Sequence, residues 1–218
     1  MKKKTRRWIA AIAAAAALIV LGWALVWGNT ALVTANVLVC SNGIPEAFDA
    51  YRIVQISDLH DAQIGENNEK LIAMTAETEP DCIVLTGDFV DSSRFHPERS
   101  LSVAESLVKI APVYYVSGNH EAILPDEDYQ ALTDGLRGLG VCVLEDESAE
   151  LTRDGQSIRL IGLTDIGFHP GTLEEKKDAL RMALSALLPE DEFSVTLAHR
   201  PELMDVYTEC GAPLVLSG

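Results

Sequence analysis

Paired cysteines are missing from this sequence. Its four cysteines (Cys40, Cys82, Cys142 and Cys210) lie far apart and form no C-x-x-C pair, which argues against a disulfide framework and against a thiolate metal site. Cys82 and Cys142 lie inside apolar runs, where buried free thiols are common. We therefore expect neither the fold nor the chemistry of the protein to depend on sulfur.

Basic residues are scarce once the first seven positions are set aside. The 218 residues include 33 acidic and 17 basic side chains, for a formal net charge of −16. Five of the basic side chains come at the very start: Lys2, Lys3, Lys4, Arg6 and Arg7. The remaining body is so acidic that it repels nucleic acid, and we expect no DNA or RNA partner. A phosphorylated substrate remains compatible if bound cations reverse the field locally.

Charge is absent from residues 8–28, which are almost entirely apolar. As a helix this stretch would span roughly 30 Å, the thickness of the hydrocarbon core of a bilayer. Trp8 and Trp27 lie near its two ends, where aromatic rings favour the membrane interface. The basic segment 1–7 should stay in the cytoplasm. We therefore predict a single-pass signal anchor in the cell membrane, with the rest of the chain extracytoplasmic.

Two other interpretations of the N-terminal stretch stay open. A cleaved signal peptide usually has an apolar region of only about 7–15 residues, but Val33-Thr34-Ala35 could serve as its cleavage site. Residues 5–9 (TRRWI) also resemble a twin-arginine export signal, which would carry a folded protein across the membrane. We favour the anchor because the apolar stretch is longer than a signal peptide needs.

After the span, apolar runs alternate with helical patterns. Residues 29–50 are expected to form a linker with a first strand at 31–39, which residues 41–43 (SNG) then break. Further strands are predicted at 51–57, 82–86, 113–117, 141–144, 149–152, 157–163, 193–198 and 213–217, and helices at 66–79, 98–109, 127–138 and 172–188. Thr172 and Glu175 have the spacing of a capping box at the start of the last helix.

This alternation predicts an α/β domain over residues 51–218. In such a domain the functional groups gather at the carboxyl ends of the strands. Residues 141–163 depart from the pattern, because strands follow one another there with only a turn at 153–155. We therefore expect a second, partly antiparallel sheet.

Four of the apolar strands end in side chains that can bind metal. The four segments are Ser57-Asp58-Leu59-His60, Thr86-Gly87-Asp88, Ser117-Gly118-Asn119-His120-Glu121 and Ala198-His199-Arg200-Pro201. Taken singly, each is typical of a turn or a helix cap. Together they hold three of the five histidines in the chain. Nitrogen and oxygen donors without sulfur suit Mn, Fe or Zn, so the four segments together favour a metal centre.

The ordered motifs D-x-H, G-D, G-N-H-E and H-x-P resemble those of the calcineurin-like metallophosphoesterase superfamily, in particular its membrane-associated bacterial branch. Here they occur as ISDLH, VLTGDFVD, VSGNHE and LAHRPE, and the resemblance covers roughly residues 50–218. It implies a four-layer fold, in which two facing mixed β-sheets are flanked by helices. It also implies a two-metal centre at the ends of the strands.

The resemblance implies a role for each residue that matches a motif. Asp58 and His60 would bind the first metal. Asp88 would bridge both metals, because each of its two oxygens can bind one ion. Asn119 and His199 would bind the second metal through an amide oxygen and an imidazole nitrogen.

His120 resembles the catalytic histidine of the family, which lies near the leaving group. The family also has a G-H-x-H motif that supplies one more histidine to each metal. In this sequence PLVLSG reaches Gly218, the last residue, where that motif would begin. We therefore expect a fold that is incomplete at this end, and a stretch up to Gly218 that lacks ligands needed for full activity.

The resemblance implies hydrolysis of a phosphate ester or diphosphate by two divalent transition metal ions (Mn, Fe or Zn), with a bridging hydroxide as nucleophile. A lipid-linked phosphate or diphosphate would suit a membrane-tethered enzyme, and phosphorylated small molecules such as nucleotides fit the motifs equally well. The alternative is an inactive scaffold of the same fold that binds a protein partner. A serine hydrolase has little support, because Ser57 and Ser117 lie in no G-x-S-x-G elbow.

Other polar residues near the motifs receive plainer interpretations. Asp61 and Asp91 are expected in surface turns, and His96 in a solvated loop. Asp165 could support the site or contact substrate, and Arg200 could contact a substrate phosphate or form a surface salt bridge. None of these five is counted among the predicted site residues.

Overall fold

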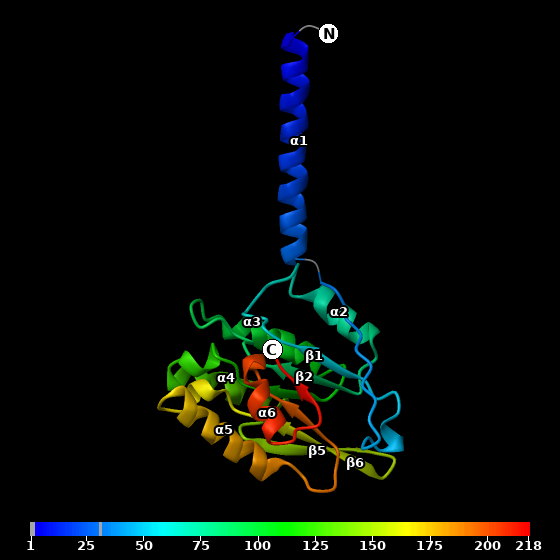
Figure 1. Cartoon of the computed structure of the whole chain (residues 1–218), viewed down its shortest axis with the longest axis vertical. Coiled ribbons are helices and arrows are strands. Elements are labelled where there is room, and N and C mark those ends of the chain that lie inside the picture. The colour runs from blue at the N-terminus through cyan, green and yellow to red at the C-terminus, as the bar shows by residue number, and fades with distance from the viewer. Residues whose placement is uncertain (1–2, 31) are drawn as a thin grey trace. The chain divides into compact units, whose positions relative to one another are not determined.

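The computed structural model describes residues 3–30 and 32–218, which are drawn in Figure 1. The chain divides into two compact units, Met1–Val37 and Leu38–Gly218. Lys2, the first residue of the predicted strand (Ala31) and the side chain of Trp27 lie outside the described part. The predictions that concern these residues therefore stay predictions.

The first unit contains one long helix, α1 (Lys3–Thr30). Its stretch Thr5–Leu25 has 21 residues and a mean hydropathy of 2.3. By length and composition this stretch could cross a membrane. The predicted span at 8–28 lies within α1.

The strand predicted at 31–39 is wrong for the described residues 32–39, which form no regular element. Val33, Val37 and Leu38 are 79%, 85% and 89% exposed. The β-branched sequence favours an extended backbone, but a strand also needs a neighbour that accepts its hydrogen bonds. None of the described strands pairs with this segment.

Two four-stranded sheets form the core of the second unit. The first has the order β1 (Ile53–Ile56), β2 (Cys82–Thr86), β3 (Val113–Val116), β4 (Cys142–Val143). The second has the order β5 (Glu147–Arg153), β6 (Gln156–Gly162), β7 (Ser194–Leu197), β8 (Val215–Leu216). Every strand predicted after residue 50 is confirmed within a few residues.

The two sheets differ in the direction of their strands. All pairs in the first sheet are parallel, because helical crossovers connect its strands. In the second sheet β5 and β6 form an antiparallel hairpin, whereas β6, β7 and β8 are parallel. The predicted second, partly antiparallel sheet is confirmed, but only this sheet is mixed.

Five helices accompany the sheets of this unit in the described residues. They are α2 (Glu69–Glu77), α3 (Pro97–Leu107), α4 (Asp126–Gly138), α5 (Leu173–Leu187) and α6 (Met204–Glu209). The first four were predicted, and α5 begins with the predicted capping box of Thr172 and Glu175. Helix α6 is too short to show a helical pattern in the sequence.

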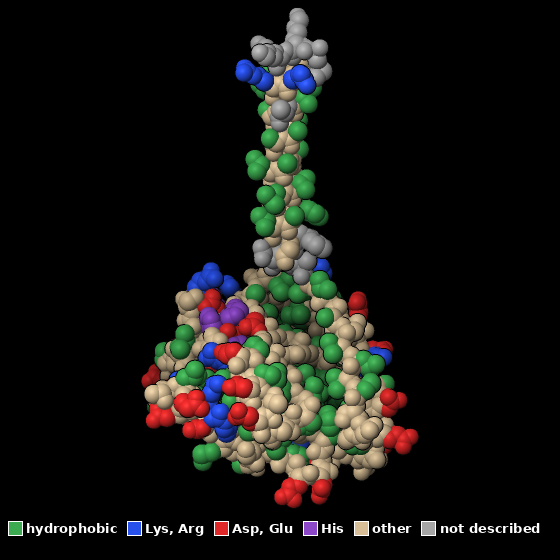
Figure 2. Space-filling model, viewed as in Figure 1, with side chains coloured by type: hydrophobic (Ala, Val, Ile, Leu, Met, Phe, Trp, Pro, Cys, Tyr) green, Lys and Arg blue, Asp and Glu red, His purple; other side chains and the backbone are tan. Residues whose placement is uncertain are grey.

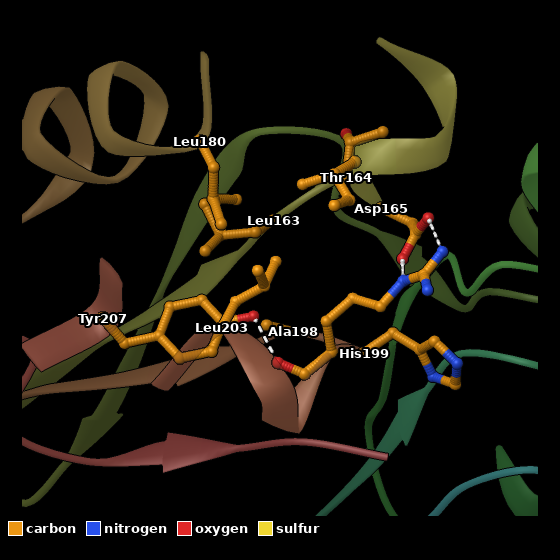
Figure 3. A pocket seen from close by; sticks show the side chains of 10 residues that line it. Leu163, Thr164, Asp165, Leu180, Ala198, His199, Leu203 and Tyr207 are labelled. Carbon is orange, nitrogen blue, oxygen red and sulfur yellow. Dashed lines mark hydrogen bonds and ion pairs between the residues drawn. The ribbon is translucent and has the colours of Figure 1, made fainter. Parts of the chain in front are cut away.

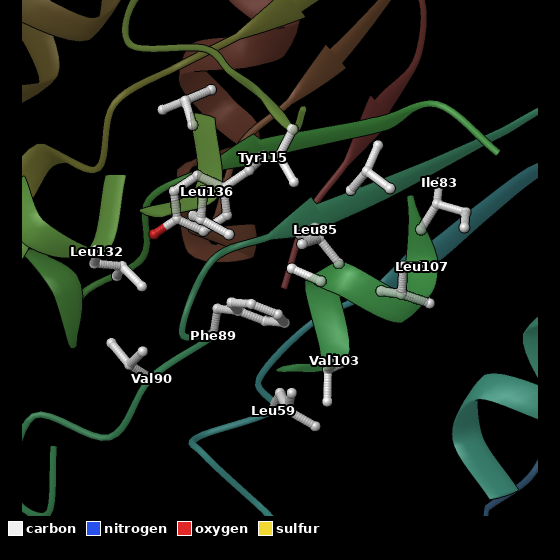
Figure 4. Close-up of a cluster of buried hydrophobic side chains, with 14 of the residues drawn as sticks. Leu59, Ile83, Leu85, Phe89, Val90, Val103, Leu107, Tyr115, Leu132 and Leu136 are labelled. Carbon is white, nitrogen blue, oxygen red and sulfur yellow. The ribbon is translucent and has the colours of Figure 1, made fainter. Parts of the chain in front are cut away.

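Three clusters of buried side chains separate four layers. On β2, Ile83 and Leu85 face α3 and α4 in one cluster, part of which Figure 4 shows. Cys82 and Val84 point to the other side of β2, into a cluster between the two sheets. A third cluster joins the second sheet to α5 and α6. This helix–sheet–sheet–helix layering confirms the four-layer fold.

Candidate metal centre

The loops that follow β1 and β2 are joined through their backbones. Three N–H groups within residues 58–61 donate to the carbonyl oxygens of residues 87–89, over 2.9–3.2 Å. Asp58, His60 and Asp88 have φ angles of 55°, 50° and 49°, in the left-handed region that Asp and His tolerate better than most residues. Backbone strain of this kind gathers at functional sites.

Asp88 lies at the centre of the site and is buried. Its Oδ2 is 3.6 Å from His60 Nε2 and 3.9 Å from His120 Nε2. Its Oδ1 is 3.4 Å from His199 Nε2 and accepts the backbone N–H of His120 at 2.8 Å. The two oxygens therefore lie near different imidazoles, Oδ2 near His60 and His120 and Oδ1 near His199.

Two groups of possible ligand atoms share Asp88. One group adds His60 and His120, and the other adds Asp58 and His199; within each, the ligand atoms lie within 4.8 Å of one another. Asp58 also lies near His60, with 3.8 Å between Oδ1 and Nε2. All donors in these groups are nitrogen or oxygen, so the residues present fit a divalent transition metal.

The imidazole of His199 is oriented by the backbone of β2. His199 Nδ1 lies 2.9 Å from the carbonyl oxygen of Thr86, and because a carbonyl oxygen can only accept, Nδ1 carries a hydrogen. His199 Nε2 faces Asp88 and lies 3.1 Å from Asn119 Oδ1. The structure thus brings together all five residues predicted as metal ligands, together with His120.

Charge coupling within the site shows in the pKa values. Burial lowers the pKa of His199, but the hydrogen bonds to Asp88 and Thr86 and the nearby carboxylates outweigh it and raise the pKa to about 9. Burial opposes ionisation of Asp88, yet hydrogen bonds from His199 and His120 hold its pKa below the usual range. A metal ion bound through His199 Nε2 would have to displace the proton on that nitrogen.

Around the site, histidines and acidic side chains gather on one face of the domain, with Lys and Arg side chains close by (Figure 2). Within this cluster, the backbone N–H of Ser92 donates to His120 Nδ1 at 3.1 Å. Asp91 Oδ1 is 3.6 Å from the same nitrogen. His120 is therefore held from the loop that follows β2.

The surface positions predicted for Asp61 and Asp91 are wrong, because the two residues are only 4% and 8% exposed. Both lie in loops as expected, but Asp61 accepts hydrogen bonds from Asp91, His96 and Ser100, which bury it. A sequence shows that a residue is suited to a turn, but not which chain folds over it. The side chain of His96 is exposed and paired with Glu98, as expected of a solvated loop.

Glu121 was missed as a site residue, although it belongs to the G-N-H-E motif. Its side chain is fully buried and accepts four backbone N–H groups, from residues 88, 89, 90 and 118, over 2.7–3.2 Å. Burial raises the pKa of this carboxyl. Glu121 thereby connects the loop that carries Asp88 to the loop that carries Asn119. The position of Glu121 directly after His120 in this motif was the feature of the sequence that could have identified it.

Asp165 and Arg200 form a pair beside His199, seen in Figure 3 as two dashed contacts to Asp165. Arg200 donates to the buried Asp165 carboxylate through Nε at 2.7 Å and Nη2 at 3.1 Å. The Asp165 N–H in turn donates to Ser117 Oγ at 3.2 Å. The carboxylate that holds Arg200 is thus buried. The pair therefore differs from the surface salt bridge that the sequence left open.

The match to known families decides what kind of protein this is. Residues 51–218 match the family described as calcineurin-like phosphoesterase. The chain belongs to this family. The metallophosphoesterase family uses divalent metals to hydrolyse phosphate esters, in agreement with the nitrogen and oxygen donors around Asp88.

Several curated proteins resemble the chain. An uncharacterized metallophosphoesterase of Bacillus subtilis (YkoQ) is 27% identical over 179 residues, which cover 81% of this chain and 63% of that protein. A transmembrane protein with a metallophosphoesterase domain from Danio rerio is 27% identical over 72% of this chain and 37% of that protein. The phosphodiesterase YaeI of Escherichia coli is 26% identical over 77% and 59%. The chain therefore spans 37–63% of the length of these three relatives.

Solved structures share the fold of this metallophosphoesterase. The protein TT1561 of Thermus thermophilus has a TM-score of 0.54 at 16% identity, over 76% of this chain and 80% of that one. The phosphopantetheinyl hydrolase of Mycobacterium tuberculosis has a TM-score of 0.50 at 17% identity, over 72% and 71%. At these identities the likeness concerns the fold alone.

Proposed function

We propose that the protein hydrolyses a phosphate ester or diphosphate at a centre of two divalent cations. The observation that carries this proposal is the convergence on Asp88 of metal-binding side chains from four loops that are far apart in the sequence. Family membership supplies the reaction class.

The ligand assignment implied by the motifs places Asp58 with His60, whereas the two groups of ligand atoms described above place Asp58 with His199. The contact between Asp58 and His60 supports the assignment by motif. The first cation would lie between Asp58, His60 and Asp88 Oδ2. His60 Nε2 is 3.8 Å from Asp58 Oδ1 and 3.6 Å from Asp88 Oδ2. The second would lie between Asn119, His199 and Asp88 Oδ1, whose oxygens are 3.1 and 3.4 Å from His199 Nε2. Mn, Fe and Zn all suit such donors.

Two cations bound there would supply a bridging hydroxide as nucleophile and offset the charge of the phosphoryl group. His120 would act on the leaving-group side. Because Nδ1 accepts the N–H of Ser92, the hydrogen of the neutral ring lies on Nε2, which faces Asp88. From Nε2 the neutral ring can donate a hydrogen bond to a phosphoryl oxygen or to the leaving-group oxygen, and the imidazolium form could transfer a proton to the leaving group and return to the neutral ring.

The N-terminal helix supports a proposal for the location and for the class of substrate. The long apolar stretch of α1 and the relatives named as transmembrane proteins support anchoring in the cell membrane, and the basic residues before this stretch support an extracytoplasmic domain. Substrates would be phosphorylated small molecules or lipid-linked phosphates and diphosphates. A relative is named a phosphodiesterase, so phosphodiesters belong in the test.

The test is to measure metal content and hydrolysis together on the purified full-length protein, with phosphomonoesters, phosphodiesters and lipid diphosphates. Asp88→Asn should lose bound metal and lower kcat by about 10³-fold or more, since the bridging carboxylate is gone. His120→Gln should keep its metal and lower kcat by about 10²–10⁴-fold. His169→Gln, in the loop after β6, is the histidine control and should leave both quantities unchanged.

Two outcomes would contradict the proposal. A folded full-length protein that binds almost no transition metal would indicate an inactive scaffold that binds a protein partner. An Asp88→Asn variant with undiminished hydrolysis would point to a hydrolase with a side-chain nucleophile.

A further inference from the structure

Arg200 directly follows His199, but its side chain belongs to a separate cluster beside the candidate metal centre. Its guanidinium donates to the Asp165 carboxylate through Nε at 2.7 Å and Nη2 at 3.1 Å, the two dashed contacts in Figure 3. A further ion pair joins Nη1 to Glu202 Oε1 over 3.4 Å. Neither acidic partner is a predicted metal ligand, so Arg200 lies next to the centre without belonging to it.

The carboxylate that holds Arg200 is itself fixed by its neighbours. The Asp165 side chain is fully buried, and its Oδ1 also accepts the backbone N–H of Gly167 at 2.7 Å. The Asp165 N–H donates to Ser117 Oγ in the loop after β3. On the other side, the backbone carbonyl of Arg200 accepts the hydroxyl of Tyr207 at 2.9 Å. The guanidinium is therefore oriented before a ligand arrives, which lowers the entropic cost of binding.

This orientation leaves one edge of the guanidinium for a ligand. A guanidinium has five N–H donors, and two neighbouring N–H groups can hold two oxygens of one anion in parallel. Nε and Nη2 use one such pair on Asp165. The second pair, on Nη1 and Nη2, is engaged by the long contact to Glu202, whose side chain is 59% exposed. A second anion can therefore bind along this edge while Asp165 stays in place.

The open edge lies at the same end of the sheets as the metal-binding loops. Asp165 follows β6 and Arg200 follows β7, and these two strands are parallel. Gly167 lies between Arg200 and the loop after His120, because a Cβ atom built there would be 4.0 Å from Arg200 Nη2 and 2.6 Å from Ala122 Cβ. Arg200 is therefore within reach of a substrate that occupies the centre.

Basic side chains are scarce around the centre, which limits the candidates for such a role. The loops that follow β1, β2, β3, β6 and β7 contain Arg94 and Arg200 and no other Lys or Arg. These loops comprise residues 57–68, 87–96, 117–125, 163–172 and 198–203. The side chain of Arg94 is 82% exposed and lies 3.5 Å from Asp91, so it would lose rotamer freedom on binding an anion. Arg200 is already ordered by Asp165.

We propose that Arg200 determines specificity by binding a second anionic group of the substrate, so that the enzyme prefers diphosphates to simple phosphomonoesters. The inference rests on the proposed function, in which the reacting phosphoryl group lies at the cations. Arg200 would hold the neighbouring phosphate of a diphosphate through Nη1 and Nη2. Water then adds across the P–O–P bond of an alkyl diphosphate, and the products are the alkyl phosphate and inorganic phosphate.

Arg200→Gln tests this role, and Arg159→Gln is the matched control. Arg159, in the middle of β6, also binds a carboxylate, with Nε and Nη2 each 3.1 Å from Glu192 Oε2. In the full-length protein, Arg200→Gln should lower kcat/KM about 10–100-fold for an alkyl diphosphate. For the alkyl phosphate of the same alcohol the loss should be at most about 3-fold, and Arg159→Gln should lower neither value by more than about 2-fold.

A binding measurement needs no turnover. Methylenediphosphonate has a P–C–P link that water does not cleave, and methylphosphonate carries a single phosphonate group. In calorimetry on the zinc-loaded protein, Arg200→Gln should weaken binding of the diphosphonate about 10–100-fold and of the monophosphonate at most about 3-fold, at equal zinc content. Glu202→Gln, which removes the competing carboxylate from Nη1, should strengthen diphosphonate binding by up to about 5-fold.

A second variant covers a failure to fold. Arg200→Gln leaves the buried Asp165 carboxylate without its partner, which is destabilising. The double variant of Arg200→Gln with Asp165→Asn replaces the ion pair by two amides and should show the same loss of diphosphonate binding. If neither folds, the exposed Glu202→Gln decides, and an unchanged affinity for the diphosphonate in that variant overturns the inference.

Two further results would overturn it. Equal losses for the diphosphonate and the monophosphonate would mean that Arg200 supports the loop after β7, and an unchanged affinity of folded Arg200→Gln for the diphosphonate would mean that it binds no second anion. If the wild type hydrolyses no phosphate ester, the proposed function fails, but the phosphonate affinities still decide the role of Arg200.

Discussion

Gly87 allows the loop that carries Asp88 to pass close to two neighbours. It has a φ of 87°, and a Cβ atom there would lie 2.7 Å from both His199 Nδ1 and the Cα atom of Gly118. Real Cβ atoms avoid such distances, and an alanine would also have to adopt a left-handed backbone. The predicted metal ligands on both sides therefore depend on the absence of a side chain here.

Gly87→Ala should lower both the melting temperature and the bound zinc, because the new methyl group displaces His199 and the Asp88 loop. Gly138→Ala is the control, since a Cβ atom at Gly138, the last residue of α4, meets nothing within 4 Å. That change should be neutral or stabilise by up to ~1 kcal/mol. Equal melting temperatures and zinc contents for the two variants would refute the steric argument.

Glu121 makes a second prediction about a single side chain. Glu121→Gln leaves one acceptor oxygen for four backbone N–H groups and turns an NH₂ group toward some of them. We expect a loss of about 1–3 kcal/mol in the free energy of unfolding, together with weaker zinc binding. Denaturant titration and zinc titration measure the two effects. The exposed Glu98, changed to Gln, should show neither.

Among the secondary-structure elements, α5 offers a prediction that leaves the site untouched. Its capping box joins Thr172 to Glu175, whose carboxylate accepts the Thr172 N–H at 2.7 Å. Thr172→Ala should destabilise the domain by ~1 kcal/mol at neutral pH, and hydrolysis at 25 °C should not change.

The effect of Thr172→Ala should depend on pH. Hydrogen bonds from the backbone and hydroxyl of Thr172 lower the pKa of Glu175. The stabilisation from the ionised carboxylate is therefore complete above the unfolded pKa of about 4.3 and is lost as the pH falls through the lower folded pKa. Denaturant unfolding of wild type and variant should differ less at acid pH than at neutral pH. A constant difference would mean that the bond from the Thr172 hydroxyl to Glu175 does not stabilise the ionised carboxylate, because the variant keeps the backbone N–H bond.

The elements also show what local sequence can predict. Strand β2 (Cys82–Thr86) is a short apolar run between turn residues and was predicted to the residue. Residues 32–39 have a similar composition but form no strand, because pairing depends on a neighbour that local sequence does not specify. The parallel order of the first sheet follows from its helical crossovers, which the alternation of elements made visible.

The candidate metal-binding residues could be predicted from the sequence, whereas the buried residues that support their loops could not. Asp58, Asp88 and His199 carry donor groups at strand ends, where chain direction alone brings loops together. Asp61 and Asp91 carry the same chemical groups, yet their burial depends on which backbone N–H groups fold over them. The type of a residue shows whether it can bind a metal ion. Which residues support the metal-binding loops depends on tertiary contacts.

At the scale of the whole molecule, charge is divided unevenly along the chain. The basic residues Lys2, Lys3, Lys4, Arg6 and Arg7 come before the apolar stretch 8–28, and the body that follows is strongly acidic. An acidic surface and a phosphorylated substrate repel each other, so bound cations would both perform the chemistry and reverse the local field. When a chelator removes the cations, the rate of hydrolysis should therefore fall more steeply than the folded fraction of the protein.

The same uneven charge predicts orientation in the membrane. Alkaline phosphatase is active only outside the cytoplasm, so a fusion of it after Gly218 should be active in bacterial cells, and the protein should stay with membranes at alkaline pH. Replacing the five basic residues before the apolar stretch 8–28 with serine should lower the reporter activity, because the positive-inside signal is lost. A fusion of green fluorescent protein, which reports the cytoplasm, should change in the opposite direction.

Each alternative for the N-terminal stretch predicts a different result in the same cells. Cleavage near Val33-Thr34-Ala35 would release a shorter protein from the membrane, which a mass measurement detects. A twin-arginine signal would lose export when Arg6 and Arg7 are both changed to lysine, although the positive charge is kept. An anchor set by charge alone tolerates that exchange, because lysine and arginine count equally in the positive-inside rule. The lysine variant therefore separates a charge-directed anchor from a receptor-read signal.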